Sequence, residues 1–211
     1  TYSELNFILL KEMVENISKE RFDKFLDRNF YDRLGATSTM FLPLRKYEKE
    51  DIAPTEEDNF LRSQLLQGYV HDEAAAVLGG ISGNAGLFSN ANDLAKLLQM
   101  FLNQGSYGGE TYLSKETVRL FTTSKSDNSR RGLGFDKPDK NNKNKSPTAN
   151  CVPASTYGHT GYTGTCFWVD PDNNIIFIFL SNRVHPSRMQ TNLMNLNIRP
   201  RIQDIIYRSI L

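Results

Sequence analysis

A glycine-rich segment, residues 157–165, carries the side chains best suited to chemistry. It reads Tyr-Gly-His-Thr-Gly-Tyr-Thr-Gly-Thr, so three glycines separate an imidazole and several hydroxyl groups. Glycine allows a close approach of the backbone or a positive φ, and polar side chains on such a segment are typical of a site. Its backbone N–H groups could also stabilise a substrate oxygen that becomes negatively charged. The candidate site residues here are His159, Thr160, Gly161, Tyr162 and Gly164.

Two apolar segments follow and are expected to position the glycine-rich segment. Residues 166–170 read Cys-Phe-Trp-Val-Asp, and residues 175–180 are an unbroken apolar run. Proline, aspartate and asparagine lie between the two segments and favour a turn. The sequence therefore predicts a hairpin of two core strands whose glycine-rich end lies at a cleft.

A second candidate site residue, Tyr2, lies at the start of a predicted helix. Ser3 is a suitable N-cap, and apolar residues follow at helical spacing on most of the circumference. Such a helix is expected to be buried and to hold Tyr2 rigidly. A phenol whose pKa is lowered by nearby cations can act as a general base, whereas a tyrosine near a chain end can also have no function.

These motifs resemble those of a known superfamily. His159-Thr160-Gly161 is similar to the Lys/His-Thr-Gly element of serine β-lactamases, penicillin-binding proteins and related esterases, and Tyr2-Ser3-Glu4 is similar to their Tyr-x-Asn element. The pattern from His71 to Pro186 resembles the esterase-type branch of bacterial β-lactamase-like serine hydrolases, which occur alone or fused behind a glycosidase module. The resemblance covers nearly the whole chain.

The resemblance assigns roles to individual residues. It implies that Tyr2 acts as general base and acid, that the backbone N–H of Tyr162 lies in the oxyanion hole, and that His159 faces the cleft. It makes Glu4, Thr160, Gly161 and Gly164 substrate-binding residues. If His159 does not bind substrate, it is a histidine hydrogen-bonded at a strand end.

Two departures from the superfamily pattern bear on the substrate. Glu4 stands where an asparagine or aspartate is usual, and a carboxylate cannot donate to the carbonyl of a penicillin-like amide. His159 replaces the lysine of β-lactamases, and its unperturbed pKa of about 6.5 makes it only partly cationic at neutral pH. Both departures favour an ester or peptide substrate over a lactam.

The nucleophile of the superfamily, in a Ser-x-x-Lys element, lies before the tyrosine and is therefore expected upstream of residue 1. The chain is expected to be the C-terminal part of a serine hydrolase and to be inactive alone. An alternative is a non-catalytic binding or positioning module of the same fold, attached to a glycosidase. A carbohydrate-active fold in its own right lacks a paired-carboxylate motif.

The expected fold class is α+β, like that of β-lactamases and DD-peptidases. Residues 1–123 are predicted to form a helical lobe with cleft loops, and residues 124–211 an antiparallel sheet with a C-terminal helix. Together they would make one incomplete domain, which lacks the N-terminal strands and the nucleophile helix and has an exposed sheet edge. Periodicity predicts helices over residues 3–17, 19–34, 93–103 and 198–211, and a shorter helix that begins at Ser114. Gly35 is a suitable C-cap of the second helix, and Ser89 or Asn90 a suitable N-cap of the third. Residues 131–135 are predicted to form a strand, 36–59 an irregular surface connection and 136–150 a solvated loop.

Composition and residue spacing argue against two kinds of partner, nucleic acid and a metal ion. The chain has 211 residues, 39% of them hydrophobic, and a net charge of +1, which indicates a globular protein and gives no reason to expect nucleic acid. His71, Asp72 and Glu73 are adjacent and do not share one face, so we expect no metal site. Cys151 and Cys166 are expected to be unrelated thiols.

The expected partners follow from the resemblance alone. They are a small-molecule or peptidoglycan-like acyl substrate and the missing N-terminal part of the same polypeptide. No cofactor is expected. The location implied by the resemblance is periplasmic or otherwise extracytoplasmic.

Overall fold

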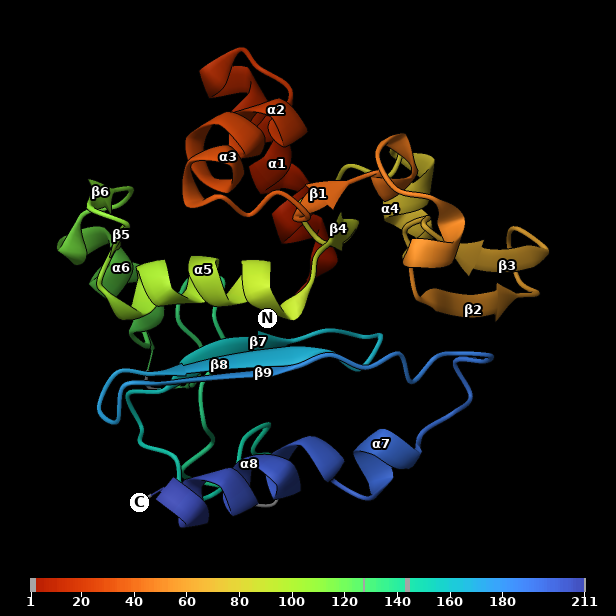
Figure 1. Ribbon diagram of the computed structural model, residues 1–211. Helices are drawn as coiled ribbons and strands as arrows, with labels where there is room; N and C mark the ends of the chain where they lie inside the picture. Colours follow the sequence, from red (N-terminus) through yellow and green to blue (C-terminus); the bar gives the residue numbers. More distant parts are fainter. Residues whose placement is uncertain (1–2, 127, 143–144, 211) are drawn as a thin grey trace. The chain divides into compact units, whose positions relative to one another are not determined.

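The computed structural model describes residues 3–126, 128–142 and 145–210. The chain folds into two compact units (Figure 1). The first unit comprises the chain up to Leu94 together with Val184–Arg188, and the second comprises Ala95–Arg183 and the chain from Met189 onward. The expected halves, residues 1–123 and 124–211, stay a prediction. No helix in the described ranges is both long enough and apolar enough to cross a membrane.

The first unit begins with a helical region. Its elements are α1 (Glu4–Ser18), α2 (Phe22–Leu26), a π-helical turn (Asp27–Tyr31) and α3 (Asp32–Leu34). Gly35 follows α3 with φ of 64°, the left-handed conformation that glycine adopts at helix ends. The two predicted helices and the predicted C-cap are confirmed.

The predicted burial of α1 is wrong. Leu5, Leu9 and Ile17 are 66%, 63% and 80% exposed. Periodicity shows which side chains share a helix face, but burial also requires another element to cover that face. One close contact occurs at Gly83, where an added Cβ would lie 2.1 Å from the carbonyl oxygen of Phe7 in α1.

Short antiparallel strand pairs complete the first unit. Strand β1 (Met40–Phe41) pairs with β4 (Leu87–Phe88), and β2 (Pro54–Asp58) pairs with β3 (Gln64–Gln67). The other elements are two 3₁₀ turns (Pro43–Arg45 and Lys49–Asp51) and α4 (Glu73–Val77). Strand β2 lies in the segment predicted to be irregular. The prediction missed this strand because acidic residues, which β2 contains, are depleted in strands generally.

Helices and a small hairpin open the second unit. They are α5 (Ala91–Leu102), which starts in the first unit, β5 (Ser106–Tyr107), β6 (Glu110–Thr111) and α6 (Lys115–Thr122). The Asn90 side chain accepts from the Asp93 N–H at 2.9 Å, and the Ser114 hydroxyl accepts from the Thr117 N–H at 3.1 Å. Both predicted N-terminal regions are thereby confirmed, since each cap satisfies an otherwise unpaired backbone donor.

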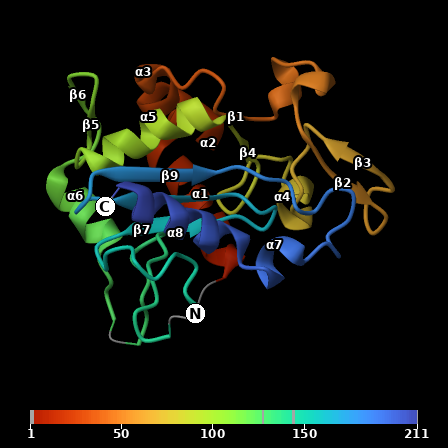
Figure 2. The same cartoon turned by 60° about the horizontal axis from the view of Figure 1, so that its bottom comes forward.

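The sheet of the second unit has the order β7-β8-β9 and is antiparallel. Its strands are β7 (Tyr157–Thr160), β8 (Cys166–Asp170) and β9 (Ile175–Phe179), followed by α7 (Asn192–Asn195) and α8 (Ile198–Ile210). Figures 1 and 2 show α5 and α8 on opposite faces of the sheet. Leu98 of α5 packs with Tyr157 and Val169, and Ile202 of α8 packs with the Trp168 cluster. The predicted hairpin and C-terminal helix are confirmed.

Two predictions about the segment before β7 are wrong. Residues 131–135 do not form a strand. Instead Asp136 alone bridges to Gly158, donating to its carbonyl at 2.7 Å and accepting from its N–H at 3.0 Å. Residues 136–150 are not a fully solvated loop, because Thr148 and Ala149 are buried. The Ala149 N–H donates to the Gln203 side chain of α8 at 2.8 Å, which ties this segment to the core.

A buried tyrosine joins α8 to the sheet. The Tyr207 hydroxyl donates to Asp170 Oδ2 at 2.7 Å, and both residues are buried. Asp170 also accepts from the backbone N–H groups of Asp172 and Asn173 in the β8–β9 turn. Burial raises the pKa of Tyr207, and the Asp170 carboxylate raises it further.

We expect Tyr207→Phe to lower the free energy of unfolding by about 2 kcal/mol, because hydrogen bonds to charged groups are worth about 1.5–3 kcal/mol. Urea unfolding measures the change. Tyr69→Phe, at an exposed tyrosine, is the matched control and should have little effect. Equal stability of both variants would contradict a stabilising role for this hydrogen bond.

Candidate active site

The predicted site segment, residues 157–165, comprises β7 and the tight turn that leads to β8, and is called the β7–β8 connection from here on. The Gly161 N–H donates to the Thr165 carbonyl at 2.8 Å, and the Gly164 N–H donates to the Gly161 carbonyl at 3.1 Å. Gly164 has φ of 109°, and an added Cβ there would lie 2.6 Å from Ser181 Oγ. A larger residue at this position would therefore be strained, so glycine is needed for the path of the loop.

His159, at the end of β7, is held through both ring nitrogens. Nδ1 lies 2.9 Å from the Thr160 carbonyl oxygen, and Nε2 lies 3.4 Å from Arg131 Nη1. A carbonyl can only accept and a guanidinium can only donate, so Nδ1 carries the proton and Nε2 accepts. Burial lowers the pKa of His159 and the Arg131 charge lowers it further, although the hydrogen bond to Thr160 and the Asp136 charge oppose this. The structure thus favours a neutral ring, where the sequence suggested a partly cationic one.

Two arginines, Arg130 and Arg131, share the buried carboxylate of Asp136, and Arg131 contacts His159. Asp136 is 2% exposed. Its carboxylate accepts from Arg130 Nε at 2.7 Å and from Arg130 Nη2 at 2.9 Å. Arg131 Nη2 lies 3.1 Å from Asp136 Oδ2. Sequence reasoning missed this group, because it assigned Arg131 to a strand and Asp136 to the solvated loop that follows.

Arg183 supports the end of the site segment. Its guanidinium lies 4.6 Å from the centre of the Tyr162 ring, and its Nε donates to the Tyr162 carbonyl at 2.9 Å. The Arg183 N–H donates to the Thr163 carbonyl at 2.8 Å. These contacts hold the two peptide groups that follow Tyr162, whose own N–H is the predicted oxyanion-hole donor.

The structure brings most of the predicted site residues together. His159, Thr160, Gly161, Tyr162 and Gly164 lie on one connection of the second unit. Glu4 is the exposed first residue of α1 in the first unit. Tyr2 lies outside the described residues, so its role stays a prediction.

A second polar group, the Glu56 cluster, lies in the first unit and comprises Glu56, His71, Glu73 and Arg188. Glu56 is 3% exposed. It accepts from the Arg188 N–H at 2.6 Å, from Arg188 Nη2 at 2.8 Å and from His71 Nε2 at 2.7 Å. Burial acts to raise the pKa of Glu56, but the hydrogen bonds from Arg188 and His71 outweigh it and lower the pKa to about 2. The cluster ties β2 to the segment Val184–Arg188.

The three adjacent residues rejected as a metal site have separate partners. His71 binds Glu56, and the Asp72 side chain accepts from the Ala75 N–H at 2.7 Å to cap α4. Glu73 accepts from Arg188 Nη2 at 2.9 Å. These side chains stabilise the fold of the first unit.

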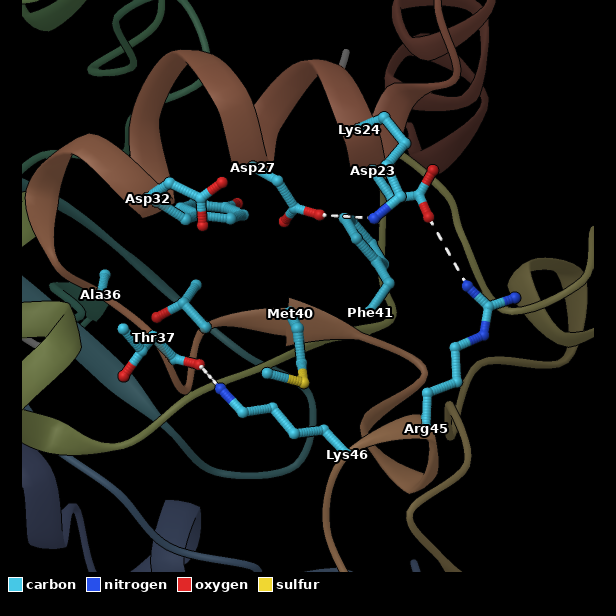
Figure 3. A pocket seen from close by; sticks show the side chains of 12 residues that line it. Asp23, Lys24, Asp27, Asp32, Ala36, Thr37, Met40, Phe41, Arg45 and Lys46 are labelled. Atoms are coloured by element: carbon cyan, nitrogen blue, oxygen red, sulfur yellow. Dashed lines mark hydrogen bonds and ion pairs between the residues drawn. The ribbon is translucent and has the colours of Figure 1, made fainter.

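A cavity of about 220 Å³ also lies in the first unit (Figure 3). Asp23, Asp27 and Asp32 line it from the helical side, and Arg45 and Lys46 line it from the loop side. Lys24 pairs with Asp27 at 3.2 Å, Arg45 lies 3.7 Å from Asp23, and Lys46 donates to the Thr37 carbonyl at 2.7 Å. Because the lining includes no predicted site residue, the β7–β8 connection remains the candidate active site.

The fold and this connection agree with a family assignment. The Beta-lactamase family model matches residues 1–197, so the chain belongs to the beta-lactamase family. Two solved structures share the fold. A beta-lactamase from Mycobacterium bovis gives a TM-score of 0.67 at 21% identity, covering 99% of this chain and 64% of that one. The penicillin-binding protein homologue from Pyrococcus abyssi gives 0.59 at 19% identity, with coverages of 99% and 45%. The predicted α+β, β-lactamase-like fold class is confirmed.

Curated relatives are more similar in sequence. A protein named "Putative D-alanyl-D-alanine carboxypeptidase" from Escherichia coli (strain K12) is 39% identical over 197 residues. The protein of the same name from Salmonella schwarzengrund (strain CVM19633) is 36% identical over 197 residues. Both alignments cover 87% of this chain and 45% of the relative, so the chain spans less than half the length of these relatives. The chain is thus β-lactamase-like, with carboxypeptidase-like relatives.

Proposed function

We propose that the full-length protein is a serine hydrolase that transfers or hydrolyses the acyl group of an ester or amide. The observation that carries this proposal is the β7–β8 connection, in which His159, Thr160 and the Gly161–Tyr162 peptide lie together at the end of a core strand. Membership of the beta-lactamase family supports the same reaction class.

In the proposed mechanism, the serine of a Ser-x-x-Lys element upstream of this chain attacks the acyl carbon. Tyr2 takes the proton of the serine hydroxyl and returns it to the leaving group, which leaves a serine ester that water then hydrolyses. The Tyr162 N–H stabilises the oxyanion, a contribution worth about 3 kcal/mol for one such donor. No cofactor takes part in these steps.

The proposed substrate is a small or peptidoglycan-like acyl compound. The Glu4 carboxylate can only accept hydrogen bonds, so it cannot donate to the carbonyl of a penicillin-like amide. This feature favours esters and peptides over lactams. The carboxypeptidase names of the relatives favour a peptide-type amide and an extracytoplasmic location.

The proposed partner of α1 is the N-terminal part of the same polypeptide. Leu5, Leu9, Met13 and Ile17 form an exposed apolar surface on this helix. A surface of this kind is normally covered by another element. Since the matched relatives are more than twice the length of the aligned segment, a longer polypeptide would contain the chain needed to cover it.

Intact-mass measurement of the full-length protein after incubation with a fluorophosphonate tests the proposed reaction. We expect a single adduct, mapped by peptide sequencing to a serine upstream of residue 1. The 211-residue chain alone is the control and should remain unmodified. Absence of an adduct on folded full-length protein would favour the non-catalytic module, and an adduct on the isolated chain would contradict the upstream nucleophile.

A further inference from the structure

We propose that Arg131 is a positioning residue that holds His159 in its neutral Nδ1–H form. In place of His159, Arg131 supplies the positive charge beside the β7–β8 connection. The importance of this inference for catalysis rests on the proposed function. Its geometry and its principal test do not.

The first step of the argument is that His159 has a donor contact and an acceptor contact on opposite ring nitrogens. The Thr160 carbonyl, 2.9 Å from Nδ1, fixes one side, and Arg131 Nη1, 3.4 Å from Nε2, fixes the other. Only one neutral tautomer satisfies both partners. Protonating Nε2 would make it a second donor that faces the Arg131 Nη1 donor. The ring is therefore suited to holding neighbouring groups in place and not to proton transfer.

The second step is that the guanidinium is itself anchored. Arg131 Nη2 lies 3.1 Å from Asp136 Oδ2. The Asp136 backbone exchanges hydrogen bonds of 2.7 and 3.0 Å with Gly158, the residue before His159. The carboxylate that holds Arg131 is therefore attached to the same strand as the ring that Arg131 contacts.

The third step concerns charge. An arginine remains protonated at any pH at which the protein is folded, whereas histidine changes charge near neutrality. With His159 neutral, the Arg131 guanidinium is a fixed positive charge in contact with the His159 ring. This arrangement gives the connection a cation whose charge does not vary over the physiological range.

Nuclear magnetic resonance of the full-length protein labelled with 15N-histidine tests the inference. Long-range 1H–15N correlations distinguish a protonated ring nitrogen from an unprotonated one, and a His159→Gln spectrum assigns the signals. At pH 7.5 we expect a protonated Nδ1 and an unprotonated Nε2. In Arg131→Gln only the Thr160 carbonyl still favours this tautomer, so we expect a weaker preference for it and titration of the ring at higher pH than in the wild type.

Two further variants separate positioning from general structure. Arg131→Lys keeps a cationic donor and should retain more of the wild-type signal than Arg131→Gln does. Arg119→Gln, at an exposed arginine of α6, should leave the spectrum unchanged. Asp136 keeps its two contacts to Arg130 in every variant, so we expect Arg131→Gln to fold, and its urea unfolding curve checks this.

A wild-type His159 that is doubly protonated or carries its proton on Nε2 at pH 7.5 would overturn the inference. A folded Arg131→Gln variant whose His159 signals match those of the wild type would also overturn the inference. If Arg131→Gln does not fold, the tautomer of the wild type and the spectrum of Arg131→Lys test the inference in its place. Because these spectra require no activity, a missing fluorophosphonate adduct would refute the proposed function and leave this test intact.

Discussion

Replacing Tyr2 by Phe in the full-length protein is expected to slow acylation by a fluorophosphonate about 10²–10⁴-fold, the usual contribution of a positioned general base. The phenol oxygen is the group proposed to remove the serine proton, and phenylalanine retains the ring but not that oxygen. The rate of adduct formation, followed by intact mass over time, measures the effect.

Tyr107→Phe is the matched control for this experiment. Tyr107 lies in the small β5–β6 hairpin, away from the β7–β8 connection in sequence and strand pairing. This control should react at the wild-type rate. If Tyr2→Phe also reacts at that rate, Tyr2 is not the base, and the family motif at residues 2–4 has lost its role.

Replacing Arg188 by Gln is expected to lower the free energy of unfolding by about 3 kcal/mol at pH 7, the lower end of the range for breaking a buried ion pair. Glu56 is 3% exposed and would lose the side-chain donors at 2.8 and 3.0 Å. It would keep the backbone N–H of residue 188 and His71 Nε2, which is why we expect the lower end. Urea unfolding measures the change.

Arg208→Gln is the control for a surface ion pair. Arg208 contacts Asp204 within α8 at 2.7 Å, and its side chain is 76% exposed, against 30% for Arg188. Exposed pairs are worth at most about 1 kcal/mol, so this variant should unfold close to the wild type. Equal effects of Arg188→Gln and Arg208→Gln would show that burial of Glu56 adds nothing to the pair.

The pH dependence gives an independent check on Arg188→Gln. The pKa of Glu56 is lowered from 4.5 to about 2, so its contribution to stability is fully present above about pH 4.5 and is lost as the pH falls towards 2. The difference between wild type and Arg188→Gln should therefore be largest above pH 4.5 and shrink below it. A difference that stays constant from pH 6 to pH 2 would assign the effect to another cause.

The elements with strong local patterns were predictable from sequence. Helices α5 and α8 repeat apolar residues at helical spacing, and α5 has a capping residue that the structure confirms. The β8–β9 hairpin consists of two apolar runs around a turn. In each case the residues that determine the element lie close together in the chain.

The features that depend on distant partners were not predictable. Strand β2 reads Pro-Thr-Glu-Glu-Asp and contradicts strand propensity, but Glu56 is neutralised by Arg188, and Asp58 by Arg62 at 2.6 Å. The burial of α1 was predicted wrongly, because a periodic pattern does not reveal what covers a helix face.

The candidate site was predictable only as far as its motif. The glycine-rich segment identified His159 through Gly164 as neighbours, and the structure confirms that they share one connection. The contact between Arg131 and His159 spans 28 residues and depends on the bridge between Asp136 and Gly158. No local pattern in the sequence indicates that bridge.

The Glu56 cluster also has a consequence for biosynthesis. Glu56 and Arg188 are 132 residues apart, and Val184–Arg188 belongs to the first unit although its neighbours on both sides belong to the second. During translation β2 emerges 132 residues before Arg188, so the first unit cannot finish folding until the segment Val184–Arg188 has left the ribosome. Since contacts of such long range slow folding, the nascent first unit should be susceptible to proteases until that segment has emerged.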